Sequence, residues 1–224
     1  MRSKQSGFTL VEIAIVLVII GLLLGGVLKG QELINSAKVK NMINDFRTVS
    51  TFVYAYQDRF KALPGDDSGV VNHVNGTLAT TPGVVGDGRI QGNWNSLTPT
   101  DESYLFWQHV RLAGLASGPT TVPAAPAAGD DYNARNADGG RLGITSVTPI
   151  ANWAGTFFVC SANINGRLAR QIDSTLDDGN TSTGTVRIVN ANGGGGGEQA
   201  NGVAYQAQPT AADDATLFTV CVAY

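Results

Sequence analysis

The sequence predicts an α+β protein in which a long N-terminal helix packs on an antiparallel sheet. An apolar run near the N-terminus continues, without proline, into a pattern with apolar residues on one helical face. The second half of the chain contains short segments rich in β-branched and aromatic residues, each bounded by turn formers. No internal repeat is visible, and 224 residues suffice for one domain and an anchor.

The apolar run from Phe8 to Leu28 is long enough to cross a membrane. Its roughly 21 residues, at about 1.5 Å rise per residue, match a hydrocarbon core of about 30 Å. A secretory signal peptide has a shorter apolar region followed by an A-x-A-like cleavage site, which is not found after this run. Glu12 lies inside the run, and an acidic residue in a membrane segment is a functional candidate by default.

After Lys29 the helical pattern changes from apolar all round to one-sided. Pro64 and Gly65 end it, so we expect one helix with a transmembrane part at 8–28 and an amphipathic part at 29–63. The apolar face of the second part recurs at steps of three and four: Met42, Phe46, Val49, Val53, Tyr56 and Phe60.

Four glycines interrupt the first part of this helix, and two explanations stay open. Small residues allow transmembrane helices to pack closely. Each glycine also weakens a helix by about 1 kcal/mol relative to alanine, which would give a segment that can extend. The residues are Gly21, Gly25, Gly26 and Gly30.

Residues 64–224 are predicted to form the globular head. Helical spacing appears at 100–115, where Leu105, Phe106, His109 and Leu112 share a face that ends at Gly114, and again at 166–179. Loops are expected at 119–131 and at the glycine-rich 190–202, which should join two neighbouring strands. The expected strands are 155–162, 184–189 and 216–224.

Charge and cysteine content limit the function classes. Fifteen basic and 18 acidic residues give a net charge of −3 without a basic stripe, so nucleic acid is not expected as the main ligand. Cys160 and Cys221 are either two buried thiols or, if the head faces an oxidising compartment, one disulfide. Basic residues flank the apolar run on both sides, so charge alone does not choose its orientation.

Catalytic signatures are not found. His73 and His109 have no second ligand at metal-binding spacing, and neither cysteine lies in a C-x-x-C motif. The run GGGGGE lacks the Lys and Ser/Thr of a phosphate-binding loop. We therefore expect neither an enzyme nor an organic cofactor.

Acidic loops are the one candidate for a metal ion. Oxygen ligands and glycine turns suit Ca²⁺, but none of the loops has the EF-hand pattern. Asp and Asn also occupy turns because their side chains bond the local backbone, and this structural explanation is favoured. The candidate ligands are Asp66, Asp67, Asp87, Asp177 and Asp178.

The N-terminal segment KQSGFTLVEIAIVLVIIGLL combines a short basic leader, Gly7, Phe8, Glu12 and an unbroken apolar helix. In this combination it resembles the class III signal peptide of type IV pilins and type II secretion pseudopilins. The resemblance is close over this segment and looser along the helix to Phe60. Three later segments are similar to parts of some pilin-like proteins without fixing the subtype: LPGD, ESYLFWQHVRLAGL and IDSTLDDGNTSTGTVR.

This resemblance implies a pilin-like fold and a prepilin with a leader at 1–7. A prepilin peptidase would cleave between Gly7 and Phe8 and methylate the Phe8 amine. The precursor would lie in the inner membrane of a Gram-negative bacterium, and the mature protein in a periplasmic or cell-surface filament, where Cys160 and Cys221 form a disulfide. The implied partners are other copies of the chain, other pilins or pseudopilins, the peptidase and an inner-membrane assembly platform.

The resemblance also implies a role for Glu12. Cleavage turns the Phe8 nitrogen into an amine, for which a carboxylate is an attractive partner in apolar surroundings. In the family reading Glu12 pairs with the Phe8 amine of a neighbouring subunit during assembly. Alternatively, Glu12 complements the dipole of its own helix or its own amine.

The chain departs from many major pilins in one respect. They have a helix-breaking proline past the middle of the apolar segment, and this chain has none. The type of filament therefore stays open. A different class of function is a membrane-anchored periplasmic binding module that does not polymerise.

Overall fold

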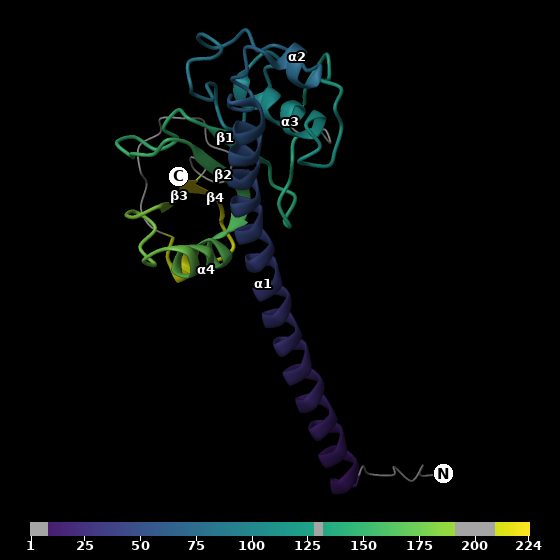
Figure 1. Ribbon diagram of the computed structural model, residues 1–224. Coiled ribbons are helices and arrows are strands. Elements are labelled where there is room, and N and C mark those ends of the chain that lie inside the picture. The colour runs from purple at the N-terminus through teal and green to yellow at the C-terminus, as the bar shows by residue number, and fades with distance from the viewer. Residues whose placement is uncertain (1–8, 128–131, 191–208) are drawn as a thin grey trace. The chain divides into compact units, whose positions relative to one another are not determined.

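A computed structural model describes residues 9–127, 132–190 and 209–224. The chain divides into two compact units, residues 1–38 and 39–224. Figure 1 shows a long helix followed by a mixed head, so the predicted α+β class is confirmed. The elements in chain order are α1 (Leu10–Phe60), α2 (Val70–Val74), α3 (Glu102–Leu112), β1 (Leu142–Thr145), β2 (Phe158–Asn165), α4 (Gly166–Leu176), β3 (Val186–Asn190), the 3₁₀ turn η1 (Ala211–Asp213) and β4 (Leu217–Ala223).

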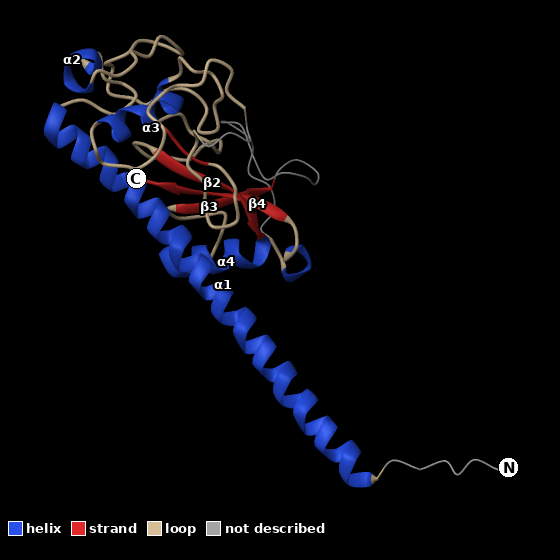
Figure 2. Cartoon of the chain, turned by 90° about the vertical axis from the view of Figure 1, so that its right-hand side faces the viewer, coloured by secondary structure: helices blue, strands red, loops and turns tan. Residues whose placement is uncertain are grey.

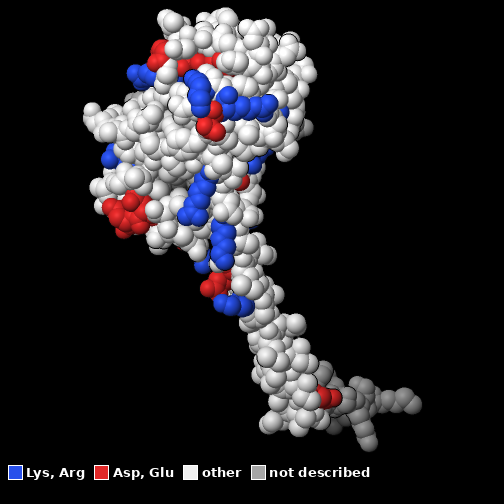
Figure 3. Space-filling model, in the orientation of Figure 1, with Lys and Arg blue, Asp and Glu red and all other residues white. Residues whose placement is uncertain are grey.

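The first unit consists, in its described part, of the first half of α1. The helix continues without interruption through all four glycines. Every side chain from Leu10 to Leu28 is exposed. Figure 3 shows this part of α1 almost without charged side chains, as the sequence of an apolar span requires.

In the second unit, α1 buries one face against the sheet. Its buried residues belong to the same hydrophobic cluster as the inward side chains of all four strands. The predicted apolar face is confirmed except at Phe60, which is half-buried. The buried positions are Val39, Met42, Ile43, Phe46, Val49, Ser50, Val53 and Tyr56.

The helix ends at Phe60, so the predicted end at residue 63 is wrong. Lys61 adopts a left-handed conformation with φ 57°, and its N–H donates to the Gln57 carbonyl at 2.9 Å. A left-handed residue after the last turn is a common way to terminate a helix. Pro64 also disfavours helical geometry at the residue before it.

The sheet has four antiparallel strands in the order β1-β2-β4-β3. The three expected strands are present, and β3 and β4 are neighbours, as the prediction for the intervening loop requires. The loop itself lies largely outside the described residues. Strand β1 was not predicted, because LGIT is short and is buried along its whole length, so it shows no alternation.

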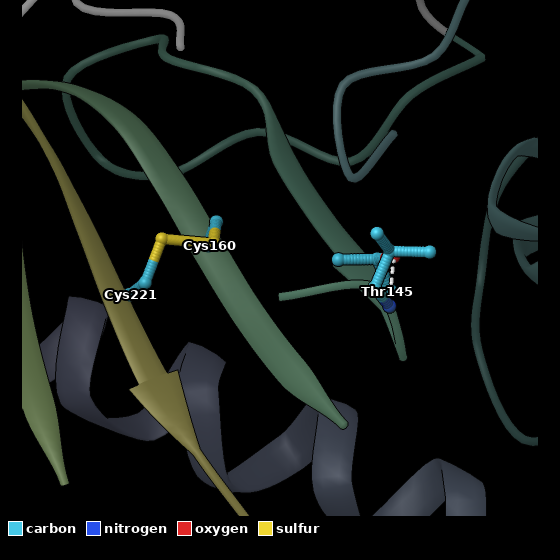
Figure 4. The surroundings of a disulfide bond; sticks show 4 residues. Thr145, Cys160 and Cys221 are labelled. Atoms are coloured by element: carbon cyan, nitrogen blue, oxygen red, sulfur yellow. Dashed lines mark hydrogen bonds between the residues drawn. A yellow bond between two sulfur atoms is a disulfide. The ribbon is translucent and has the colours of Figure 1, made fainter. Parts of the chain in front are cut away.

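Both faces of the sheet are covered. α1 and α4 pack on one face, as Figures 1 and 2 show. On the other face, loop residues Trp94, Ile150 and Trp153 form a second cluster. The Cys160–Cys221 disulfide lies in this second cluster and joins directly opposed residues of β2 and β4 (Figure 4). This is the pairing that the sequence predicts for an exported head.

Helix α3 differs from its prediction in one respect. It is present and Gly114, with φ 74°, follows its end as expected. However, all residues from Glu102 to Arg111 are buried, so no single face distinguishes the core side. The one-sided pattern is absent because loops cover the helix as well as the sheet, and loop coverage cannot be seen in a local sequence.

Candidate functional site

The start of α1 carries a reciprocal pair of hydrogen bonds between Thr9 and Glu12. Glu12 Oε2 accepts from the Thr9 N–H and from the Thr9 hydroxyl, both at 2.8 Å. The Glu12 N–H in turn donates to Thr9 Oγ1 at 3.3 Å. This arrangement is a capping box, which satisfies backbone donors that have no partner within the helix. Thr9 was missed in the sequence, although T-x-x-E before an apolar run is a sign of such a box.

The second carboxylate oxygen of Glu12 is not used by this cap. Glu12 Oε1 accepts no hydrogen bond from the described part of the chain. The side chain is exposed, so this oxygen can accept from a donor on another molecule. Gly7 and Phe8, the two predicted processing residues, lie outside the described residues.

The apolar surface next to Glu12 is continuous. Exposure is 86% at Leu10 and remains 66% at Leu28. The charged face begins at the ion pair between Lys29 Nζ and Glu32 Oε2, 2.7 Å apart. By length and composition, α1 can cross a membrane. So much exposed apolar surface marks a site that lipid or another protein covers.

A family model for the prokaryotic N-terminal methylation motif matches residues 2–28. The chain carries the class III signal peptide of type IV pilins and pseudopilins. No curated protein and no solved structure matches the chain. The motif indicates a structural, pilin-like precursor anchored by an apolar helix, rather than an enzyme. The motif covers only the N-terminal segment and says nothing about the function of the head.

Both histidines of this pilin-like head have structural partners. His109 is fully buried; its Nδ1 accepts from the Gly65 N–H and its Nε2 lies 2.9 Å from the Thr77 carbonyl. Burial lowers the pKa of His109, which favours the neutral ring that this pattern requires. His73 Nδ1 lies 2.7 Å from Asp67 Oδ2. His109 thus connects loops to α3, and His73 connects a loop to α2.

Asp66 and Asp67 are buried and fully used by the protein. Asp66 accepts backbone N–H groups from the loop at 86–89 on both of its oxygens. Asp67 accepts from Gly69 on Oδ1 and from the Tyr56 hydroxyl on Oδ2. Burial alone would raise the pKa of Asp67, but hydrogen bonds from His73, Tyr56 and Gly69 outweigh it and lower the pKa.

Asp87 likewise has local partners. It accepts from the Arg89 N–H and from the Gln91 side-chain amide. The first three candidate calcium ligands, Asp66, Asp67 and Asp87, therefore stabilise loops by hydrogen bonds. Within the described residues they do not come together as a group of metal ligands.

A further acid near this loop was missed in the sequence. Glu102, the first residue of α3, is 1% exposed, and its Oε2 accepts from the Gln91 N–H at 2.6 Å. Burial, with smaller contributions from Asp66, Asp87 and Asp101, raises the pKa of Glu102 to about 8. No local signal marks it, because its burial depends on loops that pack over α3.

The remaining two calcium candidates do come together. Asp177 and Asp178 place carboxylate oxygens within 4.8 Å of each other and of a third acid, Asp173. Asp173 was not among the sequence candidates, because the candidates come from loops that combine acidic residues with glycine. Its spacing of four and five residues from the other two was the available signal, because residues four apart share a helix face.

Proposed function

We propose that the protein is a structural subunit of a type IV pilus or pseudopilus. A prepilin peptidase removes residues 1–7, and the mature chain polymerises through its N-terminal helix. The observation that carries the proposal is the match of the methylation motif to residues 2–28, over a helix whose apolar side chains are exposed. The motif and the exposed surface coincide along the chain.

The exposed apolar surface of the helix has to be covered both in the precursor and in the filament. Apolar area contributes roughly 25 cal/mol per Å² when it is removed from water. In the precursor, lipid covers the helix from Leu10 to Leu28. In a filament, the same side chains pack against helices of neighbouring subunits. One surface thus serves membrane insertion and assembly in turn.

The geometry at Glu12 supports a contact between subunits. Oε2 is engaged in the cap of its own helix, whereas Oε1 is available within the described residues. Cleavage creates a positively charged amine at Phe8, and a desolvated carboxylate attracts it strongly. We therefore assign Glu12 Oε1 to the Phe8 amine of the adjacent subunit. The partners of the N-terminal segment are other copies of the chain, the prepilin peptidase and an assembly platform in the inner membrane.

N-terminal sequencing of the mature protein tests the proposal. We expect the sequence to start at N-methylated Phe8, and electron microscopy of a deletion strain should show loss or shortening of filaments. A protein that keeps Met1, in a strain with unchanged filaments, would contradict the proposal. That result would favour the membrane-anchored binding module.

A further inference from the structure

Three aspartates converge at the C-terminal end of α4. Asp173 lies in the last turn of the helix, and Asp177 follows its end; the Asp177 N–H donates to the Asp173 carbonyl at 2.8 Å. Asp178 is the next residue in the loop. One carboxylate oxygen from each of the three lies within 4.8 Å of the others. Figure 3 shows a compact group of acidic side chains near α4.

Asp173 is buried without a partner. Its exposure is 0%, and neither carboxylate oxygen makes a hydrogen bond to any described residue. Asp66 and Asp67 are matched comparisons, since they are 2% and 1% exposed and both oxygens of each accept hydrogen bonds. An ionised carboxylate that is buried and unpaired is strongly disfavoured. Asp173 therefore lacks the hydrogen-bond donors that Asp66 and Asp67 have.

Among the described residues, no nearby cation offsets the charge of Asp173. The C-terminal end of a helix is its negative pole, and the last turn of α4 contains no basic residue. Arg170, one turn earlier, pairs with Asp214. Burial, together with Asp178 and Asp177, raises the pKa of Asp173 to about 6. A proton or a bound cation at Asp173 would offset this buried negative charge.

The loop after α4 is held in a shape that presents oxygen atoms. Asp177 Oδ2 accepts from the Thr185 and Val186 N–H groups at the start of β3. Asp178 accepts from the Asn180 N–H and the Thr183 hydroxyl. In the same loop Thr181 Oγ1 is buried and has no described hydrogen-bond partner. Carboxylate oxygens keep further lone pairs after such bonds, so these contacts orient ligands without exhausting them.

We propose that Asp173, Asp177 and Asp178 bind a Ca²⁺ ion that ties the end of α4 to the start of β3. All three ligands are hard oxygen donors, and two of them come from a loop; Ca²⁺ takes six to eight oxygen ligands in flexible geometry, with water completing the shell. Zn²⁺ prefers nitrogen and sulfur ligands, which the cluster does not offer. The site is independent of the proposed assembly function, because it lies entirely in the head.

The test uses the full-length protein in detergent, stripped of metal with EDTA and transferred to metal-free buffer. Titration with CaCl₂ in a calorimeter should show one ion bound per chain. At a Ca²⁺ concentration about a hundredfold above Kd, the Tm should rise by roughly 5–10 °C. Binding should persist in the presence of an equal concentration of MgCl₂, since Mg²⁺ demands stricter octahedral geometry.

Three variants locate the site. Asp173→Asn should weaken Ca²⁺ binding at least about tenfold, as expected for loss of a charged ligand, and abolish the Ca²⁺-induced rise in Tm. In metal-free buffer its Tm should equal or exceed that of the wild type, because a buried unpaired charge has been removed. Asp178→Asn, at an exposed position, should fold normally and also weaken binding. Asp58→Asn, which removes an exposed acid of α1, is the control and should bind like the wild type.

Several results would overturn the proposal. They are no saturable Ca²⁺ binding at millimolar concentration, unchanged binding in Asp178→Asn, or equal weakening in Asp58→Asn. Equal stabilisation by Mg²⁺ alone would exclude Ca²⁺ as the preferred ion. If Asp173→Asn fails to fold, Asp178→Asn still decides the outcome.

Discussion

Thr9 and Glu12 cap the start of α1 by bonding each other's backbone N–H groups. The bonds engage one oxygen of the exposed Glu12 carboxylate, and the other oxygen accepts no hydrogen bond from the described residues. The two explanations for Glu12, a cap for its own helix and a partner for a neighbouring amine, are therefore compatible. Pairing with the amine depends on the charge of Glu12, whereas capping depends only on its hydrogen bonds. Substitutions can therefore show which of the two assembly requires.

Glu12→Gln should separate them. A glutamine keeps the oxygen acceptor that a capping box needs but carries no charge for the Phe8 amine. We expect normal insertion and cleavage but a strong loss of filaments, and the same result from Glu12→Ala. Immunoblots measure processing, and electron microscopy of sheared filaments measures assembly.

Thr9→Val is the matched control for this experiment, because it removes the side-chain cap and retains the charge. It should leave filaments largely intact. If Thr9→Val lost filaments as severely as Glu12→Gln, the cap rather than the charge would be the essential contact. Normal filaments from Glu12→Gln would contradict the assigned pairing.

Substitution of Gly7 should act earlier, at processing. A larger side chain such as Gly7→Leu places bulk at the bond that the peptidase cuts, so a slower-migrating precursor should accumulate. The Glu12→Gln protein, run beside it, should migrate as the mature form. Equal migration of the two proteins would place the cleavage site elsewhere.

The glycines of α1 can be tested by size. At Gly25 a Cβ would meet no described atom within 4 Å, so substitutions should not disturb the isolated helix. If the glycines serve close packing, Gly25→Ala should assemble nearly normally and Gly25→Leu should not. If they serve local melting, Gly25→Ala should already impair assembly, since alanine stabilises a helix by about 1 kcal/mol. Filament yield at constant protein level distinguishes the two.

Glu102 should make the stability of the head depend on pH. Its pKa is about 8 in the folded chain against 4.5 as the ordinary value, so the folded state holds a proton that the unfolded state releases. Stability contributed by this proton is present below about pH 4.5 and is lost as pH rises towards 8, at up to about 1.4 kcal/mol per pH unit.

Glu102→Gln should remove that part of the dependence, because a glutamine accepts the Gln91 N–H without titrating. The measurement is urea unfolding of the full-length protein in detergent, followed by tryptophan fluorescence between pH 5 and 9. Other acids titrate in both proteins and cancel in the difference. Parallel stability curves for wild type and variant would refute the assignment of this dependence to Glu102.

Loss of the disulfide should destabilise the head. Cys160 and Cys221 are 61 residues apart, and closing a loop of that length lowers the entropy of the unfolded chain by an amount worth about 4 kcal/mol. The double substitution Cys160→Ser and Cys221→Ser should reduce the free energy of unfolding by that order. Both cysteines are 0% exposed, so dithiothreitol should act on the wild type only as it unfolds. Equal stability with and without the bond would contradict this expectation.

The features that could be predicted from the sequence are those that are local along the chain. Leader, apolar run and Glu12 are adjacent, and a signal peptide is recognised as a linear segment, so the motif at residues 2–28 was readable before any fold was known. The apolar face of α1 followed from helical period, and β2, β3 and β4 from short runs between turn formers. The predicted helix was three residues too long, because the helix ends at Phe60 and Lys61 is in a left-handed conformation. Lysine rarely adopts this conformation, so the sequence does not indicate it.

Which polar groups have hydrogen-bond partners depends on the tertiary fold and could not be predicted. Asp66, Asp67 and Asp173 look alike in the sequence, yet donors from loops or helices distant in the chain reach the first two, and none of the described residues reaches the third. Burial of Glu102, and of α3 as far as Arg111, likewise depends on chain segments that pack over the helix. Burial and hydrogen bonding are properties of contacts between distant residues, and those contacts exist only once the chain has folded.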